Sequence, residues 1–387
     1  MKKLSKDERT TILFLSWRDI EAPKMGGAEI FTHEMIKRLD RKKYRIIHIS
    51  PEFEDCHREK EIDGVTYLRS GNIFSVVLKA KNYYKKNKEN IDYVVDQCNT
   101  HRFFTKFWTE KNKRIFFIHQ LTREIWDTNL SFPWNWLGKI TETPLLRLSK
   151  DDNAITVSDS TKNDLVDVGF PENKITILPE GIDFKHWDKK EFLTKEKEPT
   201  FIYVGRYSNY KGIDKVVRAF SILKADFPSS KLWIVGKKKQ EYIESVLTPI
   251  LTEKSISWGN EAQDVVYWGF VSEAKKLELM SRAHCLLFPS QREGWGLIIT
   301  EAAAVGTPSI GYNSHGIRDA LNSGKAGYLC GENTIEELVE LMKNVIEDKK
   351  EYQKKKEEAY NYSLNFHWDN TALEFDKFME KIKGDKL

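Results

Sequence analysis

Short apolar runs recur along the whole chain, and longer segments with a helical pattern separate them. The runs are rich in β-branched and aromatic residues, as in TILFLS (residues 11–16), TFIYVG (200–205) and KLWIVG (231–236). Runs this continuous are typical of strands buried on both faces, and such strands occur in parallel sheets flanked by helices. The pattern therefore predicts an α/β protein. The other expected strands are residues 44–49, 91–96, 114–119, 154–157, 174–178, 264–269, 284–290, 307–312 and 327–330.

The two halves of the chain share one order of features. The chain has 387 residues, which favours two domains, and each half opens with a strand, a glycine-bearing loop and a helix. We therefore predict two Rossmann-like, doubly wound domains, over residues 1–180 and 200–365. The polar, charged segment 181–199 between them is interpreted as a linker. Apolar residues at helical spacing predict a further helix within residues 366–387.

Charge, cysteines and hydropathy narrow the class of protein. The 62 basic and 58 acidic side chains nearly balance, at a net charge of +4, which does not predict a nucleic-acid partner. The four cysteines contain no CxxC pair, which argues against zinc ribbons and fits a reducing compartment. No window is apolar enough to span a membrane, and residues 1–10 lack the apolar core of a secretory signal. A cytoplasmic protein is expected.

Two cations follow the first strand of the second half. Arg206 comes directly after the strand and Lys211 five residues later, and Gly205 and Gly212 bracket them. In an open α/β sheet, ligands bind outside the carboxyl ends of the strands. A guanidinium and an ammonium at that place can neutralise a pyrophosphate. The alternative is a pair of solvated surface cations.

Two carboxylates separated by seven residues follow the run HCLLFPS (residues 284–290). Glu293 is expected on the loop and Glu301 in the helix that starts near Gly296. Gly294 and Gly296 expose backbone N–H groups at the start of that helix, where the dipole favours an anion. Hydroxyl groups bind carboxylates strongly, so this arrangement suits a nucleotide sugar. A surface loop before a capped helix is the alternative.

Other loop residues of the first half are weaker candidates. Gly26 and Gly27 precede a helix, where backbone N–H groups can approach a phosphate, although such a turn is often only structural. His119 ends the strand run RIFFIH and is either a functional or a packed histidine. Asp96 and Asn99 follow another strand and are candidates for contact with an acceptor.

Several segments together resemble one known family. EGWGLIITEAAAVGTPSI (residues 293–310) resembles the EX7E signature of the family 4 retaining glycosyltransferases, which have the GT-B fold. GGAE (26–29), VSDSTKNDL (157–165), LPEGID (178–183), and VGR followed by KG (204–212) fall in the order that this family shows. The resemblance covers nearly the whole chain.

The resemblance implies two Rossmann-like domains that face each other across a cleft. It implies that the second domain holds a nucleotide sugar, that the first holds the acceptor, and that the helix in 366–387 crosses back to the first domain. One departure is visible, because the family commonly has Asn where this chain has Glu180. That difference puts in doubt only the contacts made at that position.

The resemblance also implies roles for individual residues. Arg206 and Lys211 match the pair that binds the donor diphosphate and stabilises the departing nucleotide. Glu293 matches the carboxylate near the sugar, Glu301 the one near the ribose, and His119 a histidine near the sugar. The remaining donor-side positions are Gly26, Gly27, Gly205, Gly294, Trp295, Gly296, Leu297 and Ile298.

The sequence is thus interpreted as a retaining glycosyltransferase. It is expected to use a UDP or GDP sugar as co-substrate, with no cofactor, and a saccharide or lipid-linked saccharide as acceptor. No DxD triplet and no metal-ligand spacing are present, so no metal site is expected and Arg206, Lys211 and backbone dipoles must neutralise the diphosphate. Two alternatives stay open: a nucleotide-sugar epimerase on the same fold, and a non-catalytic protein that binds nucleotide sugars or glycans.

Two surface segments raise the question of a membrane partner. The segment SVVLKAKNYYKKNKEN (residues 75–90) is lysine-rich, and SFPWNWL (131–137) is aromatic. The first either faces an anionic bilayer or forms a solvated helix face, and the second either dips into lipid or buries its rings. Peripheral contact with the inner face of the membrane therefore stays open, as does the oligomeric state.

Overall fold

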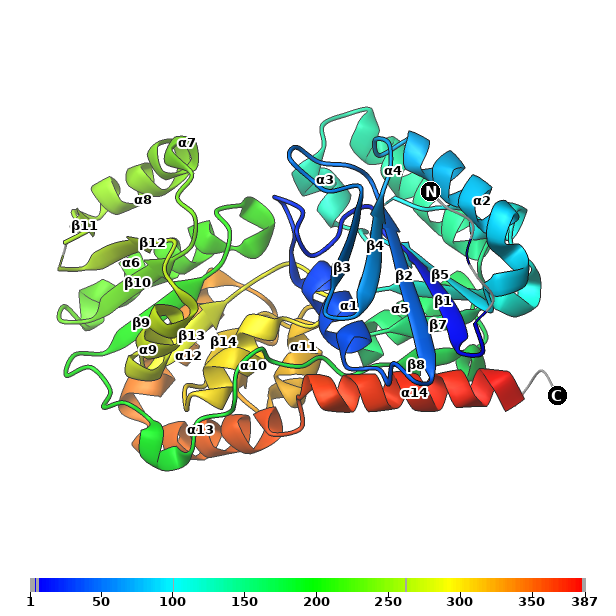
Figure 1. Cartoon of the computed structure of the whole chain (residues 1–387). Coiled ribbons are helices and arrows are strands. Elements are labelled where there is room, and N and C mark those ends of the chain that lie inside the picture. Colours follow the sequence, from blue (N-terminus) through cyan, green and yellow to red (C-terminus); the bar gives the residue numbers. More distant parts are fainter. Residues whose placement is uncertain (1–3, 5–6, 100, 262, 385–387) are drawn as a thin grey trace. The chain divides into compact units, whose positions relative to one another are not determined.

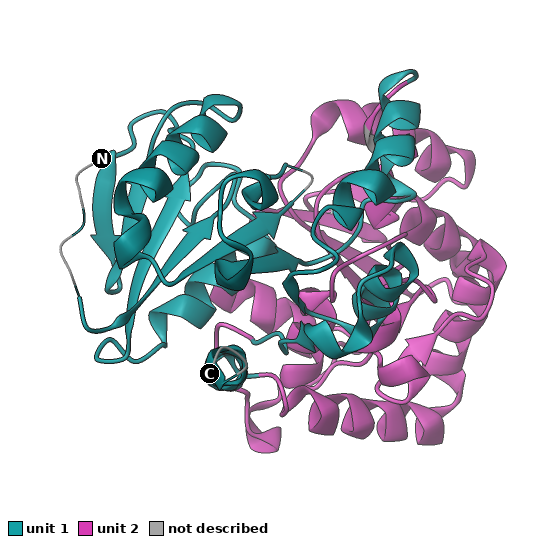
Figure 2. Ribbon diagram, turned by 90° about the vertical axis from the view of Figure 1, so that its right-hand side faces the viewer, with its two compact units in different colours: residues 1–126, 132–181, 367–387 teal, residues 127–131, 182–366 magenta. Residues whose placement is uncertain are grey.

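The computed structural model describes residues 4, 7–99, 101–261 and 263–384, and they form two compact α/β units (Figure 1). Unit 1 comprises Met1–Trp126, Phe132–Gly181 and His367–Leu387, and unit 2 comprises Asp127–Ser131 and Ile182–Phe366 (Figure 2). Each unit has one sheet with helices packed on both of its faces. The predicted α/β class with two parallel-sheet domains is confirmed.

Unit 1 contains an eight-stranded sheet in the order β3-β4-β2-β1-β5-β6-β7-β8. Its neighbouring strands are parallel, except for the antiparallel hairpin of β3 and β4 at one edge. The strands are β1 (Thr10–Leu15), β2 (Tyr44–Ser50), β3 (Glu59–Ile62), β4 (Val65–Arg69), β5 (Tyr93–Cys98), β6 (Arg114–Ile118), β7 (Asn153–Thr156) and β8 (Ile175–Ile177). The helices are α1 (Gly27–Lys37), α2 (Ser75–Asn87), α4 (Trp134–Arg147), α5 (Asp159–Val168) and α14 (Trp368–Gly384), and α3 (Ile125–Asn129) is divided between the units.

Both faces of this sheet are buried, which explains its continuous apolar strands. In β6, Ile115 and Phe117 point into one core, together with Phe31 of α1 and Phe375 of α14. Phe116 belongs to the core on the opposite face, which α4 and α5 cover. Side chains of a strand alternate between the faces, so a strand covered on both sides is apolar at every position.

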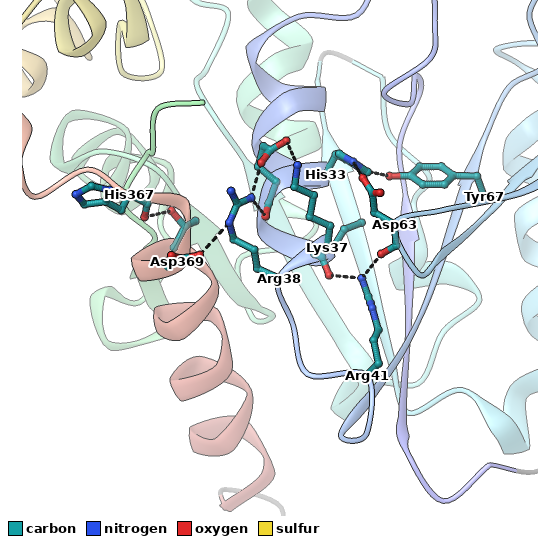
Figure 3. A network of polar contacts seen from close by, with 11 residues as sticks. His33, Lys37, Arg38, Arg41, Asp63, Tyr67, His367 and Asp369 are labelled. Carbon is teal, nitrogen blue, oxygen red and sulfur yellow. Dashed lines mark hydrogen bonds and ion pairs between the residues drawn. The ribbon is translucent and has the colours of Figure 1, made fainter. Parts of the chain in front are cut away.

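Polar contacts fix α1 to segments far away in the sequence (Figure 3). The His33 ring lies 2.8 Å from the Tyr67 hydroxyl and 3.0 Å from the Asp63 carboxylate, which connects α1 to the β3–β4 hairpin. Arg38 Nε donates to Asp369 Oδ1 at 3.0 Å, which connects α1 to α14. The last helix of the chain is thereby part of the packed structure of unit 1.

Unit 2 contains a seven-stranded parallel sheet in the order β11-β12-β10-β9-β13-β14-β15. Its strands are β9 (Thr200–Val204), β10 (Lys231–Val235), β11 (Trp258–Gly259), β12 (Val265–Gly269), β13 (Cys285–Phe288), β14 (Ser309–Gly311) and β15 (Tyr328–Leu329). Its helices are α6 (Ile213–Asp226), α7 (Gln240–Tyr242), α8 (Thr248–Glu253), α9 (Glu273–Arg282), α10 (Leu297–Ala304), α11 (Ile317–Ala320), α12 (Ile335–Glu347) and α13 (Lys349–Ser363). Within the described ranges, no helix is both long and apolar enough to cross a bilayer.

The structure differs from the sequence expectations in two places. Strands β3, β4 and β11 were not predicted, because β3 is a charged edge strand and β11 spans two residues. The Asp63–Gly64 dipeptide between β3 and β4 is the overlooked signal, since Asp-Gly favours a tight hairpin turn. Residues 182–199, expected as a linker, belong to unit 2, where Phe184 and Trp187 pack against a core cluster.

Candidate functional site

The loops after β9 and β13 meet at the carboxyl edge of the unit 2 sheet. These strands are neighbours, and the chain continues from β9 to β10 on one side and from β13 to β14 on the other. The strand order therefore reverses between them, and this is the place where open α/β sheets bind ligands. The backbone carbonyl of Tyr210 accepts a hydrogen bond from Gln291 N at 2.8 Å, and Ser290 Oγ lies 3.1 Å from the same oxygen. The two loops are thus fixed to each other.

Lys211 and Glu293 form an ion pair at this junction. Lys211 Nζ lies 2.5 Å from Glu293 Oε1, and Ser290 Oγ donates to the same oxygen at 2.6 Å. Their side chains are only 14% and 13% exposed. The Lys211 ammonium also lies 5.4 Å from the centre of the Phe288 ring. The structure therefore brings together two of the residues predicted from the sequence, 82 positions apart, in a shielded place where their charges act strongly.

Glycines allow the loops around this pair to approach closely. Gly212 has φ +73°, and a Cβ atom there would lie 2.3 Å from the carbonyl oxygen of Pro289. Gly316 has φ +76°, and a Cβ atom there would lie 2.3 Å from the carbonyl oxygen of Glu293. Any larger residue at either position would clash with these backbone atoms. It would also have to adopt a positive φ, which is unfavourable for residues other than glycine. The position of Glu293 therefore depends on these two glycines.

Arg206 lies on the same loop as Lys211 but remains exposed. Its Nη2 atom donates to the Tyr210 hydroxyl at 2.7 Å. Gly205 precedes it at the end of β9, where its N–H donates to the carbonyl of Val235 at 3.0 Å. The guanidinium is thus accessible to a ligand at the carboxyl edge, although it does not take part in the Lys211–Glu293 pair.

Glu301 pairs with a lysine from another helix. Glu301 Oε2 lies 2.6 Å from Lys276 Nζ of α9, and Lys276 also lies 2.7 Å from Glu273. Burial raises the pKa of Glu301, and the Lys276 ammonium opposes that rise. Burial lowers the pKa of Lys276, but the two carboxylates more than compensate and raise it. The ion pair with Lys276 therefore fixes the orientation of the Glu301 carboxyl group.

The start of α10 offers backbone donors between the two carboxylates. The N–H groups of the first turn of a helix have no partner within the helix, and here they include those of Leu297 and Ile298. Gly294 and Gly296 flank Trp295, whose indole Nε1 donates to Thr300 Oγ1 at 2.9 Å and whose side chain is buried. Trp295 can therefore contribute its backbone but not its ring to a ligand.

The glycine turn of unit 1 leads directly into α1. The N–H of Gly26 donates to Glu29 Oε2 at 2.6 Å, and Arg18 Nε donates to the other oxygen of Glu29 at 3.2 Å. Gly27 is exposed, and its N–H lies in the first turn, where helices lack internal partners. Glu29 thus stabilises the turn and occupies one of the amides that the sequence assigns to a phosphate.

His119 directly follows β6 and is buried. Its ring lies edge-on to Phe31, at 5.1 Å between centres, and 4.6 Å from the centre of Phe117. Its Nε2 atom is 3.4 Å from Nε2 of Gln97. Burial lowers the pKa of His119 to about 3, so this ring is neutral at physiological pH. A neutral imidazole can donate or accept a hydrogen bond but brings no charge.

Replacing His119 with phenylalanine is expected to flatten the acid limb of the stability curve. Wild-type His119 is neutral when folded but titrates near pH 6.5 when unfolded, so its contribution is complete above pH 6.5. That contribution is lost as the pH falls toward 3, by about 2 kcal/mol at pH 5. Urea denaturation of both proteins at pH 7.5 and 5.0 measures the difference. Equal losses of stability in the two proteins would contradict the assignment.

Of the two acceptor-side candidates, Asp96 lies within β5 and Asn99 directly follows this strand. The Asp96 carboxylate is buried and accepts hydrogen bonds from Phe103 N at 3.1 Å, Thr105 N at 3.2 Å and Thr105 Oγ1 at 3.0 Å. It therefore holds the following loop, which is a structural role. Asn99 is half-buried and forms an isolated bridge with His101. Their contact with an acceptor remains a prediction.

Sequence reasoning missed the residues that support the predicted ones. Ser290 ends the strand run that precedes Glu293, so its position was a usable signal. Tyr210, which contacts Arg206, also directly precedes Lys211. Lys276 gave no signal, because it lies 25 positions before Glu301 on a helix with other lysines.

Two family models match the chain in consecutive halves. Residues 25–186 match the model described as Glycosyltransferase Family 4, and residues 185–362 match the model described as Glycosyl transferases group 1. Glycogen synthase of Mycobacterium tuberculosis is 25% identical over 225 residues, which are 58% of this chain and 52% of that protein. The chain thus spans about half the length of this curated relative.

Solved structures share the fold across nearly the whole chain. Sucrose-phosphate synthase of Thermosynechococcus elongatus has a TM-score of 0.75 at 15% identity, and the match covers 97% of this chain and 100% of that one. HepE of Anabaena, solved in complex with UDP-glucose, has a TM-score of 0.71 at 16% identity, with 96% and 100% covered. At such identities the likeness establishes the fold alone.

Proposed function

The chain belongs to the glycosyl transferases of group 1 and family 4 and has the GT-B fold, and from this premise we propose that it is a retaining glycosyltransferase. It moves a sugar from a nucleotide-diphosphate sugar to a saccharide or a lipid-linked saccharide. The observation that carries the proposal is the shielded Lys211–Glu293 pair at the carboxyl edge of β9 and β13, next to the start of α10.

Each part of this site has a task in the proposed reaction. Lys211, Arg206 and the first N–H groups of α10 bind the donor diphosphate and stabilise the negative charge that grows on the leaving phosphate. Glu293 accepts hydrogen bonds from hydroxyls of the transferred sugar, and Glu301 accepts those of the ribose. The tether of Glu293 to Lys211 and Ser290 orients its carboxylate before the sugar arrives.

The bond changes are a substitution at the anomeric carbon. The bond between this carbon and the diphosphate oxygen breaks, and the acceptor oxygen bonds to the same face of the sugar. The leaving phosphate takes the proton of the acceptor hydroxyl, so no separate base is required. His119, neutral because of its burial, is proposed to contact the sugar as a hydrogen-bonding group.

The proposed reaction needs no metal ion and takes place in the cytoplasm. The diphosphate charge is met by Lys211, Arg206 and backbone N–H groups, so turnover is expected to be unchanged by EDTA. All four cysteines are free thiols, which fits a reducing compartment.

Transfer of labelled sugar tests the function. The full chain is first screened by thermal shift with UDP, GDP and their sugars, because a ligand that binds only the folded state raises the melting temperature. The sugar that stabilises the protein is then supplied in labelled form with oligosaccharide and lipid-linked acceptors. Product with the anomeric configuration of the donor supports the proposal. Isomerised donor without transfer indicates an epimerase, and binding without transfer or hydrolysis indicates a non-catalytic protein.

A further inference from the structure

The outer side of helix α2 combines exposed apolar residues with lysines. Lys79 lines a pocket that also contains Glu52 and Glu59, whereas Lys85 and Lys86 lie further along the helix. Phe74, directly before the helix, is 80% exposed, and Leu78, one turn later, is 62% exposed. Lys79, Lys85 and Lys86 are exposed on the same helix. None of these three lysines takes part in an ion pair with any residue that the structure describes. Residues 70–88 contain no Asp or Glu, so the helix carries its charge without internal neutralisation.

A second exposed apolar cluster lies at the start of α4. Phe132 is 80% exposed and Trp134 is 64% exposed, and they head a set of large exposed apolar side chains. The other members of this cluster are Trp136, Leu137 and Ile140. Single exposed apolar residues are common on protein surfaces. Several within nine positions form a patch of the kind that marks a site of interaction with a protein, a ligand or a membrane.

Both clusters belong to one layer of unit 1. Val94 of β5 packs in the core beneath α2, and Phe116 of β6 packs in the core beneath α4. These side chains lie on the same face of the sheet, because Val94 and Asp96 share a face of β5 and Asp96 pairs with Phe116. Helix α14 packs on the opposite face, against Ile115 and Phe117. Residues 101–109 connect the helices, because Trp108 contacts Tyr84 of α2 and Arg102 donates to Ser149 after α4. Phe107 of this segment is exposed as well.

We propose that the outer side of this layer, formed by α2, residues 101–109 and the start of α4, binds the surface of an anionic lipid bilayer. Lysines gain energy near anionic headgroups, whereas Phe, Trp and Leu side chains gain energy at the boundary between headgroups and acyl chains. This surface presents both kinds of group together. The proposal concerns unit 1 alone and does not depend on the reaction assigned to unit 2.

The charge of the surface argues against a second copy of the chain as its occupant. A twofold contact places the same patch of both copies face to face. The lysines of α2 would then oppose one another, with no carboxylate between residues 70 and 88 to compensate them. An anionic bilayer supplies the opposite charge and the apolar environment at once.

Vesicle binding by the full chain tests the proposal. Sedimentation with vesicles of phosphatidylcholine alone and with 30% phosphatidylglycerol is expected to show at least about 100-fold stronger binding to the anionic vesicles. Raising the salt concentration is expected to weaken that binding, because surface charges are screened. Replacing Lys79, Lys85 and Lys86 with glutamine is expected to lower the anionic partition coefficient about 100-fold, at about fivefold per lysine.

Matched variants separate the surface from general effects of charge and hydropathy. The control for the lysines replaces Lys349, Lys350 and Lys354 of α13, a helix that also contains glutamates, and is expected to leave binding unchanged. The apolar test is F74S with L78S, and its control is F270S, at an exposed phenylalanine of unit 2. Unchanged melting temperatures show that the variants fold.

Three results would overturn the proposal. Equal binding to neutral and anionic vesicles would show that the lysines do not contribute to membrane binding. An equal loss in the α13 control would make the effect one of total charge. If the F74S and L78S double variant converted a dimer of the protein into monomers and left vesicle binding unchanged, the surface would be an interface between proteins.

Discussion

Replacing Lys211 with alanine is expected to lower the turnover number for sugar transfer by about 100-fold or more. This lysine is the shielded cation at the proposed diphosphate site, and removal of one preorganised group that stabilises developing charge costs about 100- to 1000-fold. The change also leaves Glu293 without its ion-pair partner, although Ser290 still donates to it. Steady-state kinetics with saturating acceptor measure the effect. The melting temperature is expected to fall, because a shielded carboxylate loses its cation, but the variant is expected to stay folded at the assay temperature since Lys211 lies on a loop.

Two further variants sharpen this test. Arg206→Ala is expected to lower turnover by well over tenfold, because Arg206 is proposed to neutralise the charge of the donor diphosphate together with Lys211. Lys275→Ala removes a lysine of α9 that pairs with Glu278, and it serves as the matched control with wild-type turnover expected. Wild-type turnover in both the Lys211 and the Arg206 variants would eliminate the proposed phosphate role.

Replacing Glu301 with glutamine is expected to raise the dissociation constant for the nucleotide about 10- to 100-fold. The neutral amide loses the charge-assisted hydrogen bonds proposed for the ribose hydroxyls, and hydrogen bonds to charged groups contribute about 1.5–3 kcal/mol. The glutamine also cannot form the ion pair with Lys276 that orients Glu301 in the wild type, and Lys276 then pairs with Glu273 alone. Calorimetric titration with the nucleoside diphosphate measures the affinity.

A ribose-deficient ligand shows whether this loss comes from the proposed contact. The 2′,3′-dideoxy form of the same nucleotide is expected to bind wild type and the Glu301 variant with nearly equal affinity, because the partner hydroxyls are absent. Glu273→Gln is the control, since Glu273 touches Lys276 but is not assigned to the ligand. If Glu301→Gln weakens both nucleotides equally, Glu301 acts on the fold rather than on the ribose.

The two carboxylates show how far local sequence can predict a site. Glu293 and Glu301 were recognised from their spacing on either side of a helix start, which is a local feature. Their partners Lys211 and Lys276 lie 82 and 25 positions away, and only the order of strands and helices decides that they meet. For Asp96, local sequence was a poor guide to the role of the side chain. Its place at the end of an expected strand suggested contact with a ligand, but in the structure its carboxylate accepts hydrogen bonds from the loop that follows.

The sequence by itself determined the class of fold and most of the strands. Strands covered on both faces are apolar at every position, and this local requirement is written into runs such as RIFFI of β6. The tertiary structure alone decided which charges pair, which glycines permit close contact and which apolar side chains stay exposed. The reason is physical: burial and pairing depend on neighbours that lie close in space but far apart along the chain, and no local pattern encodes their distance.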